Sequence, residues 1–217
     1  MSDPRIAGLH SAALTDAMGR RHEHVAHILD WVTPTPGRVL FGPAATVQYM
    51  PYRADLHDSV HHNFARKFYE ALSGDGTGKV LVMSSGGHPG ASMGGGIKMS
   101  RPQNQALAGV LIDGRLRDFH ELAEYDFAAY CRGETVRWGG DTIMPWAADV
   151  AVQVGGVTIH PGDYVFADSA AAVIIPAADL EWVLAEAHKI DASDAGWIVK
   201  IKAEDPAEVL ARGSQEA

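Results

Sequence analysis

The stretch AGVLIDGRLRD, residues 108–118, joins a short apolar run to a turn and a pair of opposite charges. The run from Val110 to Asp113 is rich in β-forming residues and predicts a buried strand, and DGRLRDFHEL predicts its end, a turn and a helix start. Arg117 offers a planar guanidinium fork for a carboxylate, and Asp118 offers hard oxygen ligands for Mg²⁺ or Mn²⁺. Adjacent opposite charges are also common on solvated surfaces, so the pair alone leaves both interpretations open.

A glycine-rich segment, SSGGHPGASMGGG at residues 84–96, precedes this stretch. Glycine between a strand and a helix lets backbone N–H groups approach an anion without a β-carbon in the way. Residues 94–98 would offer such groups to a carboxylate or a phosphate. The segment lacks the GxGxxG spacing of dinucleotide-binding folds and the GxxxxGK[ST] of a P-loop, which disfavours a nucleotide site. A flexible surface loop is the alternative interpretation.

The rest of the chain alternates between helical and β-rich patterns. Apolar spacing predicts a helix over residues 6–18 with Ser11 as its cap, and one over 55–72 behind Asp55. Further helices are predicted over 177–189 and 205–211. β-rich runs predict strands at residues 44–50, 79–83, 110–113, 128–131, 150–154, 164–167 and 172–175. With no repeat and no linker, we expect one α/β domain over residues 1–190 and a partly helical C-terminal extension over 191–217.

Composition limits the class of protein. The chain has 217 residues, with 18 Lys and Arg against 27 Asp and Glu, and no basic run, which argues against a nucleic-acid binder. No run of 18 apolar residues predicts a membrane span, and the N-terminal residues lack the pattern of a signal peptide. The single cysteine, Cys131, excludes an intramolecular disulfide and a cysteine-based zinc site. We therefore expect a globular protein of a reducing, cytoplasmic compartment.

A set of short segments occurs in a fixed order along the chain. They are LTDAMG (14–19), FGPAATV (41–47), KVLVMSSGG (79–87), AGVLIDGRLRD (108–118), CRG (131–133), GGVTIHPGDYVFAD (155–168) and VIIP (173–176). In this combination the sequence resembles the RraA-like family, which includes the regulator of ribonuclease activity A and the class II 4-hydroxy-4-methyl-2-oxoglutarate aldolases. The resemblance implies a compact three-layer β/β/α domain of the swivelling type. It also implies assembly as a homotrimer, sometimes a hexamer, with active sites between subunits.

The resemblance implies residue roles as well. In the family's aldolases the residue matching Arg117 binds the carboxylate of a 2-oxo acid, and the residue matching Asp118 holds a divalent metal, Mg²⁺ or Mn²⁺. The positions that line the substrate carboxylate match Gly95, Gly96, Ile97 and Lys98. Breaking a C–C bond next to a 2-oxo acid generates an enolate, whose charge a metal ion stabilises as a Lewis acid. Decarboxylation of oxaloacetate uses the same enolate.

At Gly96 the chain departs from the family pattern, because these aldolases carry an acidic residue there. Candidates for the missing proton transfer are His88 in the glycine-rich segment and the pair His120 and Glu121 after Asp118. On the predicted helix over 55–72, His57 and His61 lie four residues apart. Such a pair is an alternative metal or acid–base site, and equally a polar helix face.

These observations lead to one expected function and two alternatives. We expect a divalent-metal-dependent lyase that cleaves or decarboxylates a small 2-oxo or hydroxy carboxylic acid through a metal-stabilised enolate. The glycine at position 96 leaves open a non-catalytic regulator that binds a protein of the ribonuclease type, or a specialised relative with altered chemistry. The expected partners are a small carboxylate substrate and further copies of the chain, with no nucleic acid and no membrane.

Overall fold

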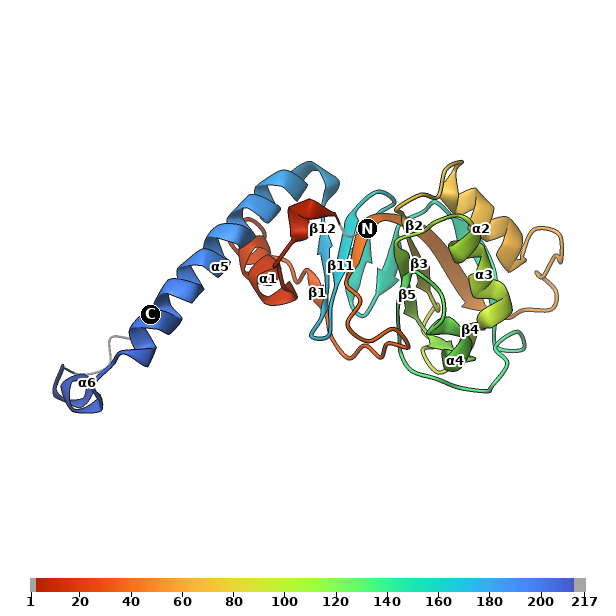
Figure 1. The fold of residues 1–217 in the computed structure, drawn as a ribbon. Helices are drawn as coiled ribbons and strands as arrows, with labels where there is room; N and C mark the ends of the chain where they lie inside the picture. Colours follow the sequence, from red (N-terminus) through yellow and green to blue (C-terminus); the bar gives the residue numbers. More distant parts are fainter. Residues whose placement is uncertain (1–2, 213–217) are drawn as a thin grey trace.

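The computed structural model describes residues 3–212. It is built around an eight-stranded sheet, with helices packed beside it (Figure 1). The strand order is β1-β12-β11-β2-β3-β5-β7, and β8 also pairs with β2. The strands are β1 (His27–Ile28), β2 (Leu40–Pro51), β3 (Val80–Ser84), β5 (Gly109–Asp113), β7 (Ala128–Cys131), β8 (Ile143–Ala148), β11 (Tyr164–Ala167) and β12 (Ala172–Ile175). Two small two-stranded sheets flank it, β4 (Ser92–Gly94) with β6 (Arg115–Leu116), and β9 (Val152–Val154) with β10 (Val157–Ile159).

The long strand β2 joins the two halves of the sheet. Its first residues pair antiparallel with β11, where Phe41 lies opposite Phe166, and its middle pairs parallel with β3, where Val47 lies opposite Met83. β5 and β7 continue the parallel half. β3, β5 and β7 are buried along their whole length, as expected for parallel strands that are covered on both faces.

Alternate residues of the parallel strands enter two different buried clusters. Leu81 and Met83 face the cluster that contains the helices α2 (Phe64–Leu72), α3 (Gly96–Asn104) and α4 (Phe119–Leu122). Val80 and Val82 face the opposite cluster, which contains the β9–β10 hairpin. The layers are therefore hairpin, sheet and helices, and the predicted α/β class is confirmed.

The antiparallel end of the sheet carries a third cluster, formed with α1 (Ser11–Gly19) and α5 (Leu180–Lys202). The prediction of a helix over 177–189 is too short, because the turn η2 (Ala177–Asp179) leads into an α5 that continues to Lys202. Every side chain from 192 to 202 is exposed, and this outer part projects away from the body (Figure 1). The short helix α6 (Pro206–Arg212) follows, close to its predicted range.

The predicted helix over 6–18 is in fact two elements. A 3-10 turn, η1 (Pro4–Ile6), precedes α1, and Ser11 is the first residue of α1, whereas His10 occupies the cap position. The Ser11 backbone N–H and hydroxyl both donate to the Asp168 carboxylate, each at 2.8 Å. Ser11 was therefore wrongly predicted as a helix cap, and it ties α1 to the loop after β11 instead.

The predicted helix over 55–72 is wrong in its first half. Only Phe64–Leu72 is helical, and Leu56 and Val60, which continue the apolar periodicity, are exposed. The Asn63 side chain accepts from the Arg66 N–H and so begins the helix at Phe64. Upstream, the Asp58 carboxylate accepts from the Val60 N–H at 2.7 Å. Such local side-chain bonds compete with helix formation, which is why the polar stretch folds as turns.

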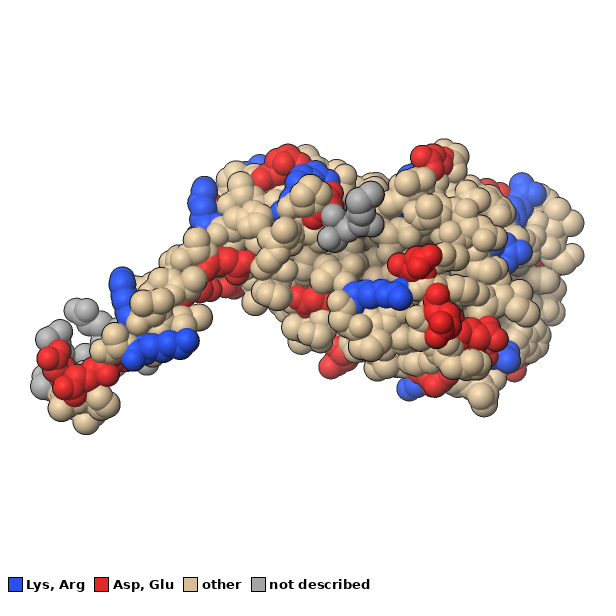
Figure 2. Space-filling view, viewed as in Figure 1, with Lys and Arg blue, Asp and Glu red and all other residues tan. Residues whose placement is uncertain are grey.

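Charges of both signs are dispersed over the face that Figure 2 shows. On the face shown in Figure 2, the Lys and Arg side chains of the described residues stand among Asp and Glu side chains. Within residues 3–212, no helix is both long enough and apolar enough to cross a bilayer.

Candidate active site

The glycine-rich segment and the Arg117–Asp118 pair meet at one edge of the sheet. β3 and β5 lie side by side and parallel, so the loops that follow Ser84 and Asp113 leave from the same edge. Within these loops β4 pairs with β6, and the Arg117 N–H donates to the Gly94 carbonyl at 2.9 Å. In open α/β sheets this edge is where ligands usually bind. The glycine-rich segment and the Arg-Asp pair therefore form one surface.

Asp118 is held in an uncommon backbone conformation at this surface. Its φ is 60°, in the left-handed region, and it occupies the cap position of α4. Asp118 Oδ2 accepts from the Gly96 N–H at 3.1 Å and lies 2.4 Å from the point that a β-carbon on Gly95 would take. Residue 95 must therefore be glycine for the carboxylate to lie there. The second oxygen, Oδ1, accepts no hydrogen bond from the described residues.

Arg117 presents its charge to solvent. The side chain is exposed, and its guanidinium makes no hydrogen bond or ion pair within residues 3–212. The Arg117 Cβ lies 3.0 Å from the point that a β-carbon on Gly95 would take, so this residue adjoins the start of α3. The N–H groups of Ile97 and Lys98 at that start have no acceptor in the described part of the chain. The Tyr125 hydroxyl donates to the Gly96 carbonyl at 2.8 Å and fixes this helix start. A cation and two free N–H donors are the groups that bind a carboxylate.

Glu121 occupies the space that a side chain at residue 96 would need. Its Oε2 lies 1.6 Å from the point that a β-carbon on Gly96 would take. The Glu121 carboxylate accepts no hydrogen bond from the described residues, so both of its oxygens are available. Glu134 supports this arrangement, because its Oε1 accepts from the Phe119 N–H at 3.0 Å and holds the first turn of α4.

The two histidine candidates near the site are placed differently. His120 is exposed on α4, and its ring contacts no described residue through a hydrogen bond, ion pair or ring contact. His88 lies in the loop before β4, where its N–H donates to the Ser85 hydroxyl at 3.0 Å. No hydrogen bond links His88 to Arg117 or Asp118 among residues 3–212.

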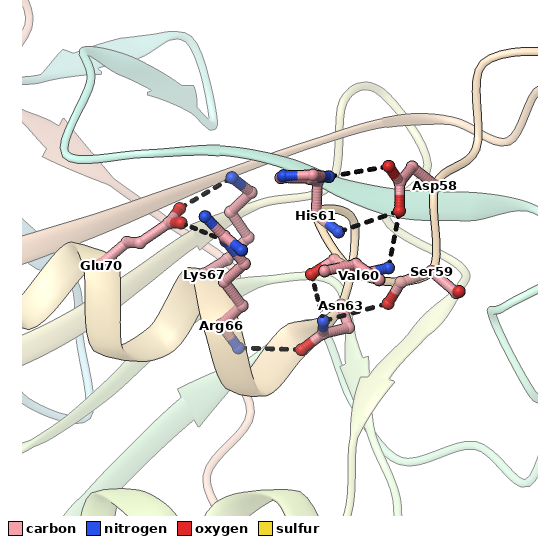
Figure 3. A network of polar contacts seen from close by, with 8 residues as sticks. All are labelled: Asp58, Ser59, Val60, His61, Asn63, Arg66, Lys67 and Glu70. Carbon is pink, nitrogen blue, oxygen red and sulfur yellow. Dashed lines mark hydrogen bonds and ion pairs between the residues drawn. The ribbon is translucent and has the colours of Figure 1, made fainter.

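His57 and His61 do not share a helix face, because residues 55–63 are not helical. His61 Nδ1 lies 2.7 Å from Asp58 Oδ2, within the polar network that precedes and begins α2 (Figure 3). The hydrogen bonds from His61 and from the Val60 N–H lower the pKa of Asp58 to about 2. His57 contacts the rings of Tyr52 and His62 instead. The predicted i, i+4 geometry is therefore wrong, and the network organises a turn.

Lys98 reaches the site through its backbone, while its ammonium group lies elsewhere. The Nζ atom is 5.5 Å from the centre of the Phe64 ring and 3.5 Å from the Met93 carbonyl oxygen. Burial, with the nearby Arg101 charge, lowers the pKa of Lys98 below its usual range.

The donor set suits a hard divalent cation with an incomplete protein shell. No group of three or more His, Cys, Asp and Glu residues that could hold a metal occurs in the described range. Asp118 nevertheless offers a carboxylate oxygen, Oδ1, that no described residue uses, while its Oδ2 is held by the Gly96 N–H. Mg²⁺ typically takes one or two carboxylates, several waters and oxygens of the substrate. The residues present therefore fit a Mg²⁺ or Mn²⁺ ion.

Sequence reasoning missed two residues that shape the site, Tyr125 and Glu134. Their contacts with the starts of α3 and α4 join positions far apart in the chain, and neither residue belongs to a local motif. A cleft of about 1070 Å³ also opens elsewhere, near Arg5, Arg38 and Asp126. The charged groups there are already paired within the chain, for example Arg38 with the Phe127 carbonyl and Asp126 with Gln103.

The chain matches a family model and several known proteins. A family model described as RraA-like, Aldolase/RraA, matches residues 11–174. A protein of Halalkalibacterium halodurans, provisionally named 4-hydroxy-4-methyl-2-oxoglutarate aldolase, is 30% identical over 153 residues, which is 70% of this chain and 67% of that protein. A Burkholderia mallei protein with the same provisional name is 34% identical over 116 residues, 51% of this chain and 67% of that one.

Among solved structures, an uncharacterized protein from Pseudomonas syringae pv. tomato has a TM-score of 0.79 at 23% identity, covering 94% of this chain and 89% of that chain. Streptomyces coelicolor RraAS2, described as an unusual member of the RNase ES inhibitor RraA protein family, has a TM-score of 0.78 at 24% identity, covering 92% and 100%. At these identities the two structures support the fold alone.

Proposed function

Because this chain belongs to the Aldolase/RraA family, we propose that it is a divalent-metal-dependent carbon–carbon lyase acting on a small 2-oxo or hydroxy carboxylic acid. The observation that carries the proposal is that Arg117 adjoins the open start of α3 and Asp118. Neither the Arg117 guanidinium nor Asp118 Oδ1 has a partner among residues 3–212. A substrate of the kind named for the relatives, 4-hydroxy-4-methyl-2-oxoglutarate, and the smaller oxaloacetate both carry the 2-oxo carboxylate that these groups would recognise.

In the proposed reaction Arg117 binds the substrate carboxylate with two parallel hydrogen bonds, and the Ile97 and Lys98 N–H groups donate to the same anion. This fixes the bond to be broken relative to the keto group, which removes part of the entropic barrier. Asp118, held by the Gly96 N–H through Oδ2, would hold the divalent cation through Oδ1. A bound Mg²⁺ or Mn²⁺ supplies Lewis acidity toward the keto oxygen of a 2-oxo acid.

We further propose that the site is completed by a neighbouring copy of the chain in a homotrimer or hexamer. Three large apolar side chains near the site are strongly exposed: Ile97 at 87%, Val136 at 90% and Trp138 at 66%. A bridge between Ser92 and Trp138 places the segment of Trp138 beside β4. Large exposed apolar side chains that gather in one region of a surface often mark an interface.

The test is turnover of oxaloacetate and of 4-hydroxy-4-methyl-2-oxoglutarate by the purified protein, with Mg²⁺, with Mn²⁺ and with EDTA. We expect pyruvate to form from both acids in a metal-dependent manner. The proposal fails if neither acid is consumed with either metal.

A second candidate function is a regulator that binds a protein of the ribonuclease type. The exposed Trp138 and Val136 favour it, because such side chains also suit a heterologous partner. The unpaired Arg117 favours the lyase, since protein binding alone gives no reason for a carboxylate-binding group beside metal-type ligands. Recovery of a ribonuclease from lysate by a protein that turns over neither acid would favour the regulator.

A further inference from the structure

Lyase chemistry at this site needs a proton acceptor, and the structure separates the candidates. Retro-aldol cleavage converts a hydroxyl group into a carbonyl, so the hydroxyl proton must be removed as the C–C bond breaks. The acceptor has to reach the space above the start of α3, between Arg117 and Asp118. His88 has no hydrogen bond to that surface within the described range, and the exposed His120 ring has none at all.

Glu121 alone among the candidates contacts that surface with its functional group. Its Oε2 lies 1.6 Å from the point that a β-carbon on Gly96 would take, and Gly96 is the residue after Gly95, which Asp118 Oδ2 approaches. The backbone holds it there, because the Glu121 N–H donates to the Asp118 carbonyl at 2.9 Å and Glu134 fixes the preceding Phe119. Neither oxygen of Glu121 is used by another described residue.

We infer that Glu121 is the proton acceptor of the retro-aldol step, an inference that rests on the proposed function. The C4 hydroxyl proton passes to the Glu121 carboxylate, the C4–O bond becomes a carbonyl, and the electrons of the C3–C4 bond form the enolate of pyruvate. The protonated Glu121 then returns the proton to C3. Cleavage of 4-hydroxy-4-methyl-2-oxoglutarate thus gives two molecules of pyruvate, with no net proton change and no co-reactant.

The test compares two reactions in one protein. Decarboxylation of oxaloacetate passes through the same enolate and has no hydroxyl proton to remove, so the ratio of the retro-aldol rate to the decarboxylation rate isolates the role of Glu121. We expect this ratio to fall about 100-fold or more in Glu121→Gln, the scale of acid–base catalysis. Gly96→Ala should lower the same ratio, because its methyl group displaces the carboxylate.

The matched control is Glu124→Gln, also exposed and placed just after α4, which should leave the ratio at the wild-type value. Pyruvate binding in the presence of Mg²⁺, measured by calorimetry, should stay within about 3-fold in Glu121→Gln, which separates proton transfer from substrate binding. Equal losses of both reactions in Glu121→Gln would overturn the assignment of Glu121. A wild-type protein inactive on both acids would overturn the proposed function itself.

Discussion

The Glu121 carboxylate and a side chain at Gly96 would occupy the same space, since Glu121 Oε2 lies 1.6 Å from the point that a β-carbon at residue 96 would take. The family's aldolases are expected to carry their acid at the position of Gly96, on α3. In this chain an acid reaches the same place from α4. The Glu121 carboxylate can therefore lie at this place only because residue 96 has no side chain.

Gly96→Ala should cost little stability. The atom that its methyl group meets is the far end of a flexible side chain, which can rotate into solvent, so we expect a change of about 0.5 kcal/mol or less. In Gly109→Ala the methyl group meets the Ala128 carbonyl oxygen at 2.1 Å, between two paired strands, and we expect a loss of about 3 kcal/mol. Thermal unfolding measures both, and similar losses would mean that Glu121 cannot move aside.

Arg117→Lys should impair activity while leaving the fold intact. The guanidinium has no partner among the described residues, so its removal breaks no internal contact. A lysine cannot form the two parallel bonds to a carboxylate, and a charge-assisted hydrogen bond contributes about 1.5–3 kcal/mol. We expect kcat/KM to fall about 10- to 100-fold for both acids. An unchanged kcat/KM would remove Arg117 from the substrate site.

Asp118→Asn tests the metal role without disturbing the backbone. Asn tolerates the left-handed conformation at φ 60°, and its side-chain oxygen can still accept from the Gly96 N–H. We expect the unfolding temperature to stay near that of the wild type and Mn²⁺ binding, measured by calorimetry, to weaken at least about 10-fold. The matched control is Asp149→Asn, also at positive φ, which should bind Mn²⁺ as the wild type does.

Asp168 should link stability to pH through its contacts with Ser11. Burial raises its pKa, but hydrogen bonds from the Ser11 N–H and hydroxyl and from the N–H groups of Ala170 and Ala171 together outweigh burial and hold the pKa below its usual range. The folded state therefore favours the ionised form of Asp168 over the protonated form. Its contribution is complete above the unfolded pKa of about 3.9 and is lost as the pH falls through the lower folded value.

Asp168→Asn should accordingly lower the free energy of unfolding at pH 7 by about 1–3 kcal/mol, the cost of impairing buried hydrogen bonds. The difference from the wild type should shrink as the pH falls below 4. Urea titrations at a series of pH values measure it. A difference that stays constant down to pH 2 would show that the carboxylate charge contributes nothing.

Trp138→Asp should weaken self-association. The side chain is 66% exposed in the single chain, so its replacement costs little in the monomer, whereas a charge in an apolar interface is expensive. We expect sedimentation to show a shift from the oligomer toward the monomer, with a parallel loss of lyase activity. The control is Val25→Asp, which changes another exposed apolar residue and should leave self-association unchanged. Trp182 is unsuitable as a control because its ring lies against the Arg21 guanidinium. An oligomer unaffected by Trp138→Asp would exclude this surface as the interface.

The strands were more predictable than the site. The runs at 128–131, 164–167 and 172–175 are apolar, rich in β-formers and bounded by breakers, and the structure confirms their limits. The helix over 55–72 failed because Leu56 and Val60 continue an apolar period through residues whose side chains bond to their own backbone. Apolar periodicity depends on residue spacing alone, so it does not show where side-chain bonds to the backbone replace helical hydrogen bonds.

The elements of the site were predictable in part. The Arg-Asp pair and the glycine-rich segment can be recognised from local sequence and from the family resemblance. The structure brings them together through the β4–β6 pairing. The placement of Glu121 over Gly96 depends on how closely α4 approaches the start of α3, which Tyr125 and Glu134 help to fix. Such long-range contacts leave no local pattern in the sequence.

The helix α5 is continuous, but only its inner turns are stabilised by packing against the domain. Its inner turns bury Val183, Leu184 and Ile190, whereas all side chains from 192 to 202 are exposed. Isolated helices of this length are marginal in water, so we propose that the outer turns unfold independently of the domain, together with the C-terminal extension. Their amide hydrogens should exchange through local fraying, whereas the inner amides exchange with global unfolding. A partner that covers Trp197 would then be detected as slowed exchange confined to the outer turns.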